Sequence, residues 1–186
     1  MAFDVKGKSF DKHIKMESCD TEVVFHIHGL GNGYGSEDND HEKYGCWVVL
    51  TLQVKSHIFN YCKKQDEMLM LGEIKNLRDY LCDLVNDRLE KEAAIGFIEP
   101  DLGFVLSPKF NWHDKNKGWC KKELEIVDIS GELILNLHDK GGVYTGEKYS
   151  FPLGRGDIVL MRDYLSEVYP HLESEWARAA VKSEGE

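Results

Sequence analysis

Two segments in the first third of the chain alternate between apolar and polar positions. Residues 21–30 (TEVVFHIHGL) place Val23, Phe25 and Ile27 on one face, which is the two-residue period of a β-strand. Residues 46–54 (CWVVLTLQV) are apolar on both faces at first and alternate afterwards, as is typical of a central strand. The pattern predicts two strands separated by a glycine-rich, acidic loop at 29–42.

The period then changes to three and four residues, which is the spacing of one face of a helix. A first apolar stripe predicts a helix over 72–90 and consists of Ile74, Leu77, Leu81, Leu84 and Val85. A second stripe predicts a helix over 157–169 and consists of Ile158, Met161, Leu165 and Val168. We expect Asp157 to cap the second helix and Pro170 to end it. The charged residues 173–186 are expected to form a frayed tail, with Trp176 as a partial anchor.

Short β-rich runs separate the two predicted helices. Strands are expected at 94–98, 103–107, 124–129, 132–137 and 144–152. We interpret Glu99–Leu102 as a turn and Ser130-Gly131 as a tight hairpin between two of these strands. Strands in hairpins with two amphipathic helices indicate an α+β fold with mainly antiparallel sheets, in one domain over 1–172 followed by the tail.

Composition and charge narrow the functional classes. The chain has 186 residues, of which 42% are hydrophobic, and this is enough for one core. Since no apolar run is long enough to span a bilayer and residues 1–15 lack the apolar middle of a signal peptide, we expect a soluble, cytoplasmic protein without a membrane partner. The net charge of −10 argues against nucleic-acid binding and favours a basic protein partner, although solubility alone also explains it.

Five cysteines cannot all pair within one chain, and none of them forms a C-x-x-C motif. This usage suits a reducing compartment. Neither a zinc ribbon nor a thioredoxin-type redox site is therefore indicated.

His26 and His28 are the candidate metal ligands. Residues two apart on a strand point the same way, so both imidazoles are able to approach one ion. His41, or an acid of the loop at 29–42, would have to supply a third ligand. The alternative interpretation is that both histidines belong to the polar face of an edge strand.

The tested catalytic patterns are absent from the sequence. It contains no Gly-x-Ser-x-Gly elbow, and the glycines of residues 29–35 do not match a phosphate-binding loop. Pro100-Asp101 could begin a nuclease-like pattern, which would need an Asp/Glu-x-Lys further along the chain. No Asp/Glu-x-Lys follows Asp101. We therefore expect a protein that is not an enzyme and that uses no cofactor.

One candidate for the partner-binding surface combines acids and tryptophans. The loop acids Glu37, Asp38, Asp40 and Glu42 are suited to steering a basic protein. Trp112 and Trp119 lie in a polar segment, where exposed tryptophans often anchor an interface. In the alternative interpretation, these aromatic side chains hold a loop against a sheet.

The order of features resembles the WapI-type immunity protein family. The resemblance rests on Trp47 in its strand, on the amphipathic helix, and on a segment similar to Phe-x-Glu-Pro-Asn-Leu-x-Phe. In this chain the four central residues of that segment are Glu99, Pro100, Asp101 and Leu102, with aspartate where asparagine is usual. The resemblance covers about residues 21–172, and the long loop at 29–42 is not typical of the family.

This resemblance implies an intracellular antidote that binds and blocks the C-terminal domain of a toxin. Many such toxins are basic nucleases, and the antidote would need no catalytic residue of its own. Two alternatives stay open. One is a small metal-dependent enzyme or ligand-binding domain that uses His26 and His28, and the other is a small-molecule binder with a deep apolar pocket between sheet and helix.

Overall fold

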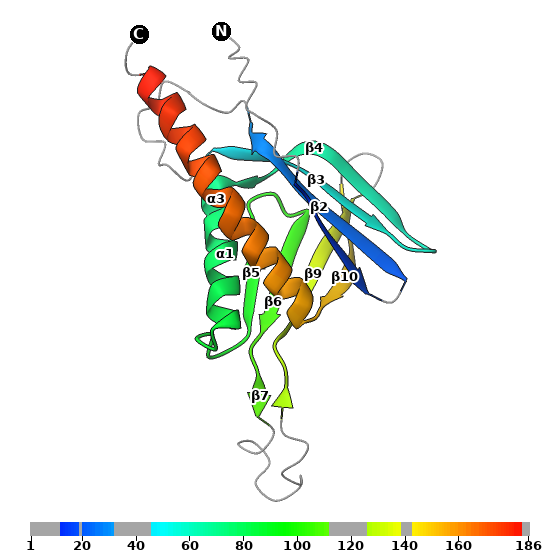
Figure 1. Cartoon of the computed structure of the whole chain (residues 1–186). Coiled ribbons are helices and arrows are strands. Elements are labelled where there is room, and N and C mark those ends of the chain that lie inside the picture. The colour runs from blue at the N-terminus through cyan, green and yellow to red at the C-terminus, as the bar shows by residue number, and fades with distance from the viewer. Residues whose placement is uncertain (1–11, 19, 32–45, 112–125, 139–142, 184–186) are drawn as a thin grey trace, which may run out of the picture.

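A computed structural model of the chain describes residues 12–18, 20–31, 46–111, 126–138 and 143–183. It contains two antiparallel sheets of four strands each, a two-stranded ribbon and two helices (Figure 1). The predicted α+β class is therefore confirmed. No helix in the described ranges is long and apolar enough to cross a membrane.

The first sheet has the strand order β1-β2-β3-β4. Its strands are β1 (Ile14–Ser18), β2 (Thr21–Leu30), β3 (Trp47–Lys55) and β4 (Asn60–Met70). The predicted strands at 21–30 and 46–54 are confirmed as β2 and β3, which pair with each other in the middle of the sheet. Val23, Phe25 and Ile27 are fully buried, so the two-residue period did identify the inward face.

The second sheet has the strand order β10-β9-β6-β5. Its strands are β5 (Ala93–Gly96), β6 (Leu102–Ser107), β9 (Ser130–His138) and β10 (Tyr144–Leu153). The ribbon of β7 (Phe110–Asn111) and β8 (Ile126–Val127) extends from one end of this sheet (Figure 1). Each of the four strands in this sheet overlaps a predicted strand.

The predicted hairpin at Ser130-Gly131 is wrong, because both residues belong to the continuous strand β9. Gly131 pairs with Leu106 on one side and with Leu153 on the other. A Cβ at this position would meet the carbonyl oxygen of Val105 at 2.8 Å. The glycine therefore permits a close approach of strands inside the sheet, rather than a turn.

Helix α1 (Leu71–Val85) confirms the first predicted stripe but ends five residues earlier than expected. Ile74, Leu77, Leu81 and Leu84 are buried. At the beginning of the helix, the carboxylate of Glu73 accepts the backbone N–H of Met70 at 2.8 Å. At its end, Asp87 has a φ of 56°, in the left-handed region that stops helix propagation.

Helix α3 (Arg155–Ser183) is longer than predicted at both ends. Asp157 does cap it, but from inside the first turn, where its carboxylate accepts the N–H of Gly154 at 3.0 Å. The expectation that Pro170 ends the helix is wrong, since Pro170 lies inside it. The apolar stripe continues beyond the proline through the buried Leu172 and the partly buried Trp176.

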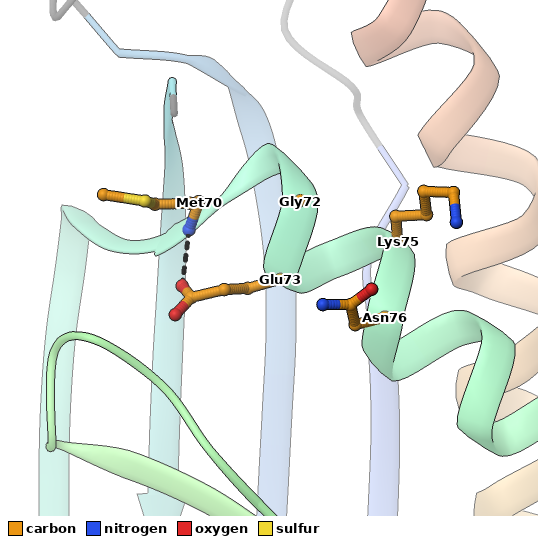
Figure 2. Close-up of a pocket in the computed structure, with 5 residues that line it drawn as sticks. All are labelled: Met70, Gly72, Glu73, Lys75 and Asn76. Carbon is orange, nitrogen blue, oxygen red and sulfur yellow. Dashed lines mark hydrogen bonds between the residues drawn. The ribbon is translucent and has the colours of Figure 1, made fainter. Parts of the chain in front are cut away.

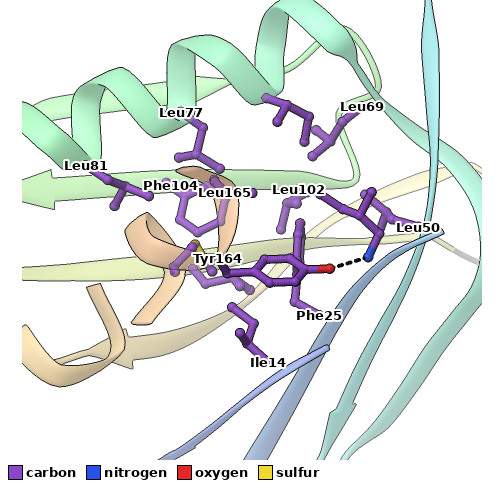
Figure 3. Packing of buried hydrophobic residues seen from close by; sticks show 14 of the residues in the cluster. Ile14, Phe25, Leu50, Leu69, Leu77, Leu81, Leu102, Phe104, Tyr164 and Leu165 are labelled. Carbon is purple, nitrogen blue, oxygen red and sulfur yellow. Dashed lines mark hydrogen bonds between the residues drawn. The ribbon is translucent and has the colours of Figure 1, made fainter. Parts of the chain in front are cut away.

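The two helices pack on each other and on the sheets around one hydrophobic core. Figure 3 shows Phe25 and Leu50 from the first sheet, Leu102 and Phe104 from the second, and Leu77 from α1 gathered around Tyr164. The C-terminal half of α3 is held to α1 by a cation–π contact, in which the guanidinium of Arg78 lies 4.5 Å from the ring centre of Tyr169. Tertiary packing of this kind offsets the cost of a proline inside a helix.

Candidate functional site

The Glu-Pro-Asp-Leu segment forms the turn between β5 and β6, as predicted. Pro100 and Asp101 occupy the turn, and Leu102 begins β6 with its side chain in the core. Asp101 is one of two buried polar or charged residues found in the described ranges. A buried carboxylate has to be paired, and so its partners define a site.

Residues from two strands, β4 and β9, contact Asp101. Lys63 of β4 donates a hydrogen bond to Oδ2, and His138 of β9 has its Nδ1 3.0 Å from Oδ1. The backbone N–H of Asn136 donates to the carbonyl oxygen of Asp101 at 2.9 Å. Burial lowers the pKa of Lys63, but the hydrogen bond to Asp101 and its negative charge outweigh burial and raise that pKa.

Two buried polar atoms on β4 and β9 have no hydrogen-bond partner among the described residues. They are the hydroxyl of Tyr61 and the side-chain oxygen of Asn136. Burial raises the pKa of Tyr61 to about 12, and the negative charge of Asp101 adds to this effect. The amide nitrogen of Asn136 donates to the carbonyl oxygen of Pro100, which ties the turn to β9.

The polar joint, which we define as Lys63, Asp101, Asn136 and His138, connects the two sheets. Lys63 belongs to the first sheet, and the other three residues belong to the second sheet or to its β5–β6 turn. The family-motif residue Asp101 thus links the two sheets through its contact with Lys63. Trp47 lies elsewhere, half-buried at the beginning of β3 and paired in register with Met70.

His26 and His28 lie side by side on the half-buried face of β2, but β2 is an inner strand of the first sheet and not the edge strand of the alternative interpretation. Their ring centres are 4.0 Å apart, and His13 lies 5.9 Å from His26. Nε2 of His28 shares a hydrogen bond of 2.8 Å with the hydroxyl of Thr51. Burial lowers the pKa of His28, and the charges of His26 and Lys64 lower it further.

A metal site needs three or four ligands. Within the ranges that the structure covers, no group of three His, Cys, Asp or Glu side chains is placed to hold a metal ion. His41 and the loop acids, which were the candidate third ligands, lie outside the described residues. The two histidines therefore do not complete a metal site with any described neighbour.

Two adjoining hollows lie beside α1, and neither is a deep apolar pocket. The larger, of about 440 Å³, is lined by Met70 and by the first turns of the helix (Figure 2). The smaller, of about 210 Å³, lies between α1 and the edge strand β5. Glu73 and Asn76 line both hollows, so the two adjoin along α1, and we refer to them together as the groove.

The six residues of the predicted partner-binding surface lie outside the described residues. They are Glu37, Asp38, Asp40, Glu42, Trp112 and Trp119. Their predicted role stays a prediction. Lys63 and His138 were not singled out from the sequence, because no local pattern connects a lysine with a histidine that lies 75 positions further along the chain.

Comparison with known families defines the class of the protein, which is an immunity protein. The model of the Immunity protein WapI-like family matches residues 18–171, which is most of the chain. The chain therefore belongs to the Immunity protein WapI-like family, and the resemblance seen in the sequence is confirmed. The comparison with curated proteins found no match. Family membership supports a toxin-binding immunity role in general and suggests a protein without catalytic activity.

Proposed function

We propose that this chain is a cytoplasmic antidote that binds a basic toxin domain and covers its active surface, with no bond-making chemistry of its own. The observation that carries the proposal is the family match over residues 18–171. The net charge of −10 supports a basic partner, because opposite charge accelerates association and favours the correct encounter. Occlusion requires only a complementary surface, and the antidote keeps its own structure while bound.

The test first identifies a gene for a large secreted protein beside the gene for this chain, and then uses the C-terminal domain of that protein. Isothermal titration should give a nanomolar Kd, and one equivalent of the chain should abolish the toxin domain's activity in vitro. Growth of cells that express the toxin domain should be restored by co-expression of the chain. A basic protein of similar size without toxin activity is the control for charge alone.

Two results would separate the parts of this proposal. A Kd weaker than micromolar, or toxin activity that persists in the complex, would overturn the immunity role. A nanomolar Kd that does not change with salt concentration would leave that role in place but remove the basic partner, because charge attraction is screened by salt.

A further inference from the structure

The sheet edges differ in how they are protected against pairing with another strand. Edge strands usually carry charges, bulges or prolines, which prevent a further strand from adding. Lys15 on β1 pairs with Glu17 and Glu22, and β4 contains two irregularities in its register with β3. Strand β10 has an irregular register and contains Pro152. Among the edge strands of the two four-stranded sheets, only β5 (AAIG) has no charge, no proline and no irregularity.

Two residues of β5 direct their backbone groups away from the sheet. The carbonyl oxygen of Ile95 lies toward β6, because a Cβ added to Gly103 would meet it at 3.2 Å. Backbone groups alternate in direction along a strand, so Ala94 and Gly96 present theirs at the outer edge. Just beyond the strand, the N–H of Ile98 donates to Oε1 of Glu73 at 2.7 Å. This bond lies beyond Gly96, at the end of the edge.

The groove beside this edge offers side chains that are not engaged elsewhere. Asn76 and Tyr80 of α1 face Ala94–Phe97 across the smaller hollow. Both side chains are exposed, and within the described ranges neither makes a hydrogen bond. In Figure 2, Glu73 and Asn76 lie on one side of α1 and Lys75 points to the other. Ile98, which is 64% exposed, extends the surface beyond the end of the strand.

Acidic side chains outnumber basic ones in the sequence around β5. Residues 83–101 contain six acidic and two basic side chains. Glu73 lines the groove, and Glu92 and Glu99 lie on either side of β5 in the sequence. Within the described part of the chain, none of these three carboxylates has an ion-pair partner. A segment that adds to this edge would gain from carrying lysine or arginine.

We propose that the β5 edge holds an extended, basic segment of the toxin domain as a fifth strand of the second sheet. The backbone groups of Ala94 and Gly96 would supply the ladder hydrogen bonds, and Asn76 and Tyr80 would contact the added strand from α1. The inference rests on the proposed function, and it names the surface and the form of the partner. The absence of charge, proline and irregularity on β5 would follow from this role, because such features prevent a further strand from adding.

Substitution of Ala94 by proline tests the proposal on the same toxin domain. Ala94→Pro removes one outward N–H and leaves the bonds to β6 in place, as edge positions tolerate. We expect a Kd at least about tenfold weaker for Ala94→Pro, and a loss of similar size for Tyr80→Ala. The matched control is Ser150→Pro on β10, the opposite edge of the same sheet, which should leave the Kd within about twofold of the original value.

Amide hydrogen exchange provides a second measurement that needs no variant. In the ¹⁵N-labelled wild-type chain, the amides of Ala94 and Gly96 should exchange at least about tenfold more slowly once the toxin domain is bound. If the wild type binds, while Ala94→Pro and Tyr80→Ala keep its Kd and exchange does not slow, the edge proposal is overturned and the proposed function stands. If the wild type does not bind, both are overturned. Should Ala94→Pro not fold, as judged by circular dichroism, Tyr80→Ala and the exchange measurement decide.

Discussion

The hydroxyl of Tyr164 shows how one buried polar atom supports the end of a strand. The pairing of β2 with β1 ends at Phe25, and Ile27 lies two residues beyond that point. The N–H of Ile27 donates instead to the hydroxyl of Tyr164 at 2.8 Å. The same hydroxyl donates to the carbonyl oxygen of Lys12 at 3.2 Å. Helix α3 therefore supplies a hydrogen-bond acceptor to β2 at a position where the edge strand β1 no longer pairs with it.

Tyr164→Phe should lower the free energy of unfolding by about 1–3 kcal/mol, because it leaves the buried N–H of Ile27 without an acceptor. Urea unfolding at pH 7 measures this change. Tyr144→Phe is the control, since the ring of Tyr144 is 46% exposed and should contribute little. Equal stability of the two variants would show that the hydroxyl of Tyr164 is not required.

The same variant has a signature at alkaline pH. Burial raises the pKa of Tyr164 from 10.0 to about 12. Between these values the unfolded chain loses a proton that the folded chain keeps, so the stability falls as the pH rises from 10 to 12. The wild type should lose more stability over this range than Tyr164→Phe does. Tyr61, whose pKa is also raised to about 12, is present in both proteins and does not affect the comparison.

At the scale of elements, the polar joint fixes one sheet relative to the other. Lys63 and Asp101 are 38 residues apart and belong to different sheets. The side chain of Asp101 is 9% exposed and that of Lys63 33%. The carboxylate is therefore shielded on the core side, while the lysine still reaches water.

Asp101→Asn should lower the free energy of unfolding by about 1–2 kcal/mol, because Lys63 and His138 lose a charged acceptor. A double-mutant cycle with Lys63→Met isolates the pair, and Lys64→Met, at an exposed neighbour on β4, is the control. We expect the Asp101 and Lys63 substitutions to be non-additive and the Lys64 substitution to be additive. A coupling energy below about 0.3 kcal/mol between Asp101 and Lys63 would show that their ion pair does not stabilise the polar joint.

For the whole molecule, the acidity is distributed and not confined to one end. Residues 1–90 and residues 91–186 each carry a formal charge of −5. The field that an approaching toxin domain meets therefore arises from the entire surface, and any local steering is added to it. Glu37, Asp38, Asp40 and Glu42 are the densest acidic group in the sequence, and they are the residues on which we expect local steering to depend.

Reversal of these four acids to lysine should slow association with the toxin domain by about tenfold at low salt. It should also flatten the dependence of the association rate on ionic strength, as measured by stopped-flow fluorescence. The variant with glutamine and asparagine at the same positions serves as a graded control and should give an intermediate rate. An association rate that is the same in all three proteins would remove these acids from the account of binding.

The sequence by itself determined the elements whose signal is periodic and local. The inward faces of β2 and α1 followed from the positions of Val23, Phe25 and Ile27 and of Ile74, Leu77 and Leu81, because burial of one face imposes the period. The β5–β6 turn followed from Pro100 and Asp101. Strand β4 was missed, since its polar residues lie at an exposed, irregular sheet edge and show no alternation.

Only the tertiary structure decided the meaning of signals that have two physical explanations. In the sequence, Gly131 predicts a turn. In the structure it lies inside β9 between β6 and β10, where a Cβ would meet the carbonyl oxygen of Val105. In the sequence, Pro170 predicts the end of a helix. In the structure α3 continues beyond Pro170, where it packs on α1. The joint around Asp101 and the open edge of β5 depend on neighbours that are distant in the chain, so no local pattern records them.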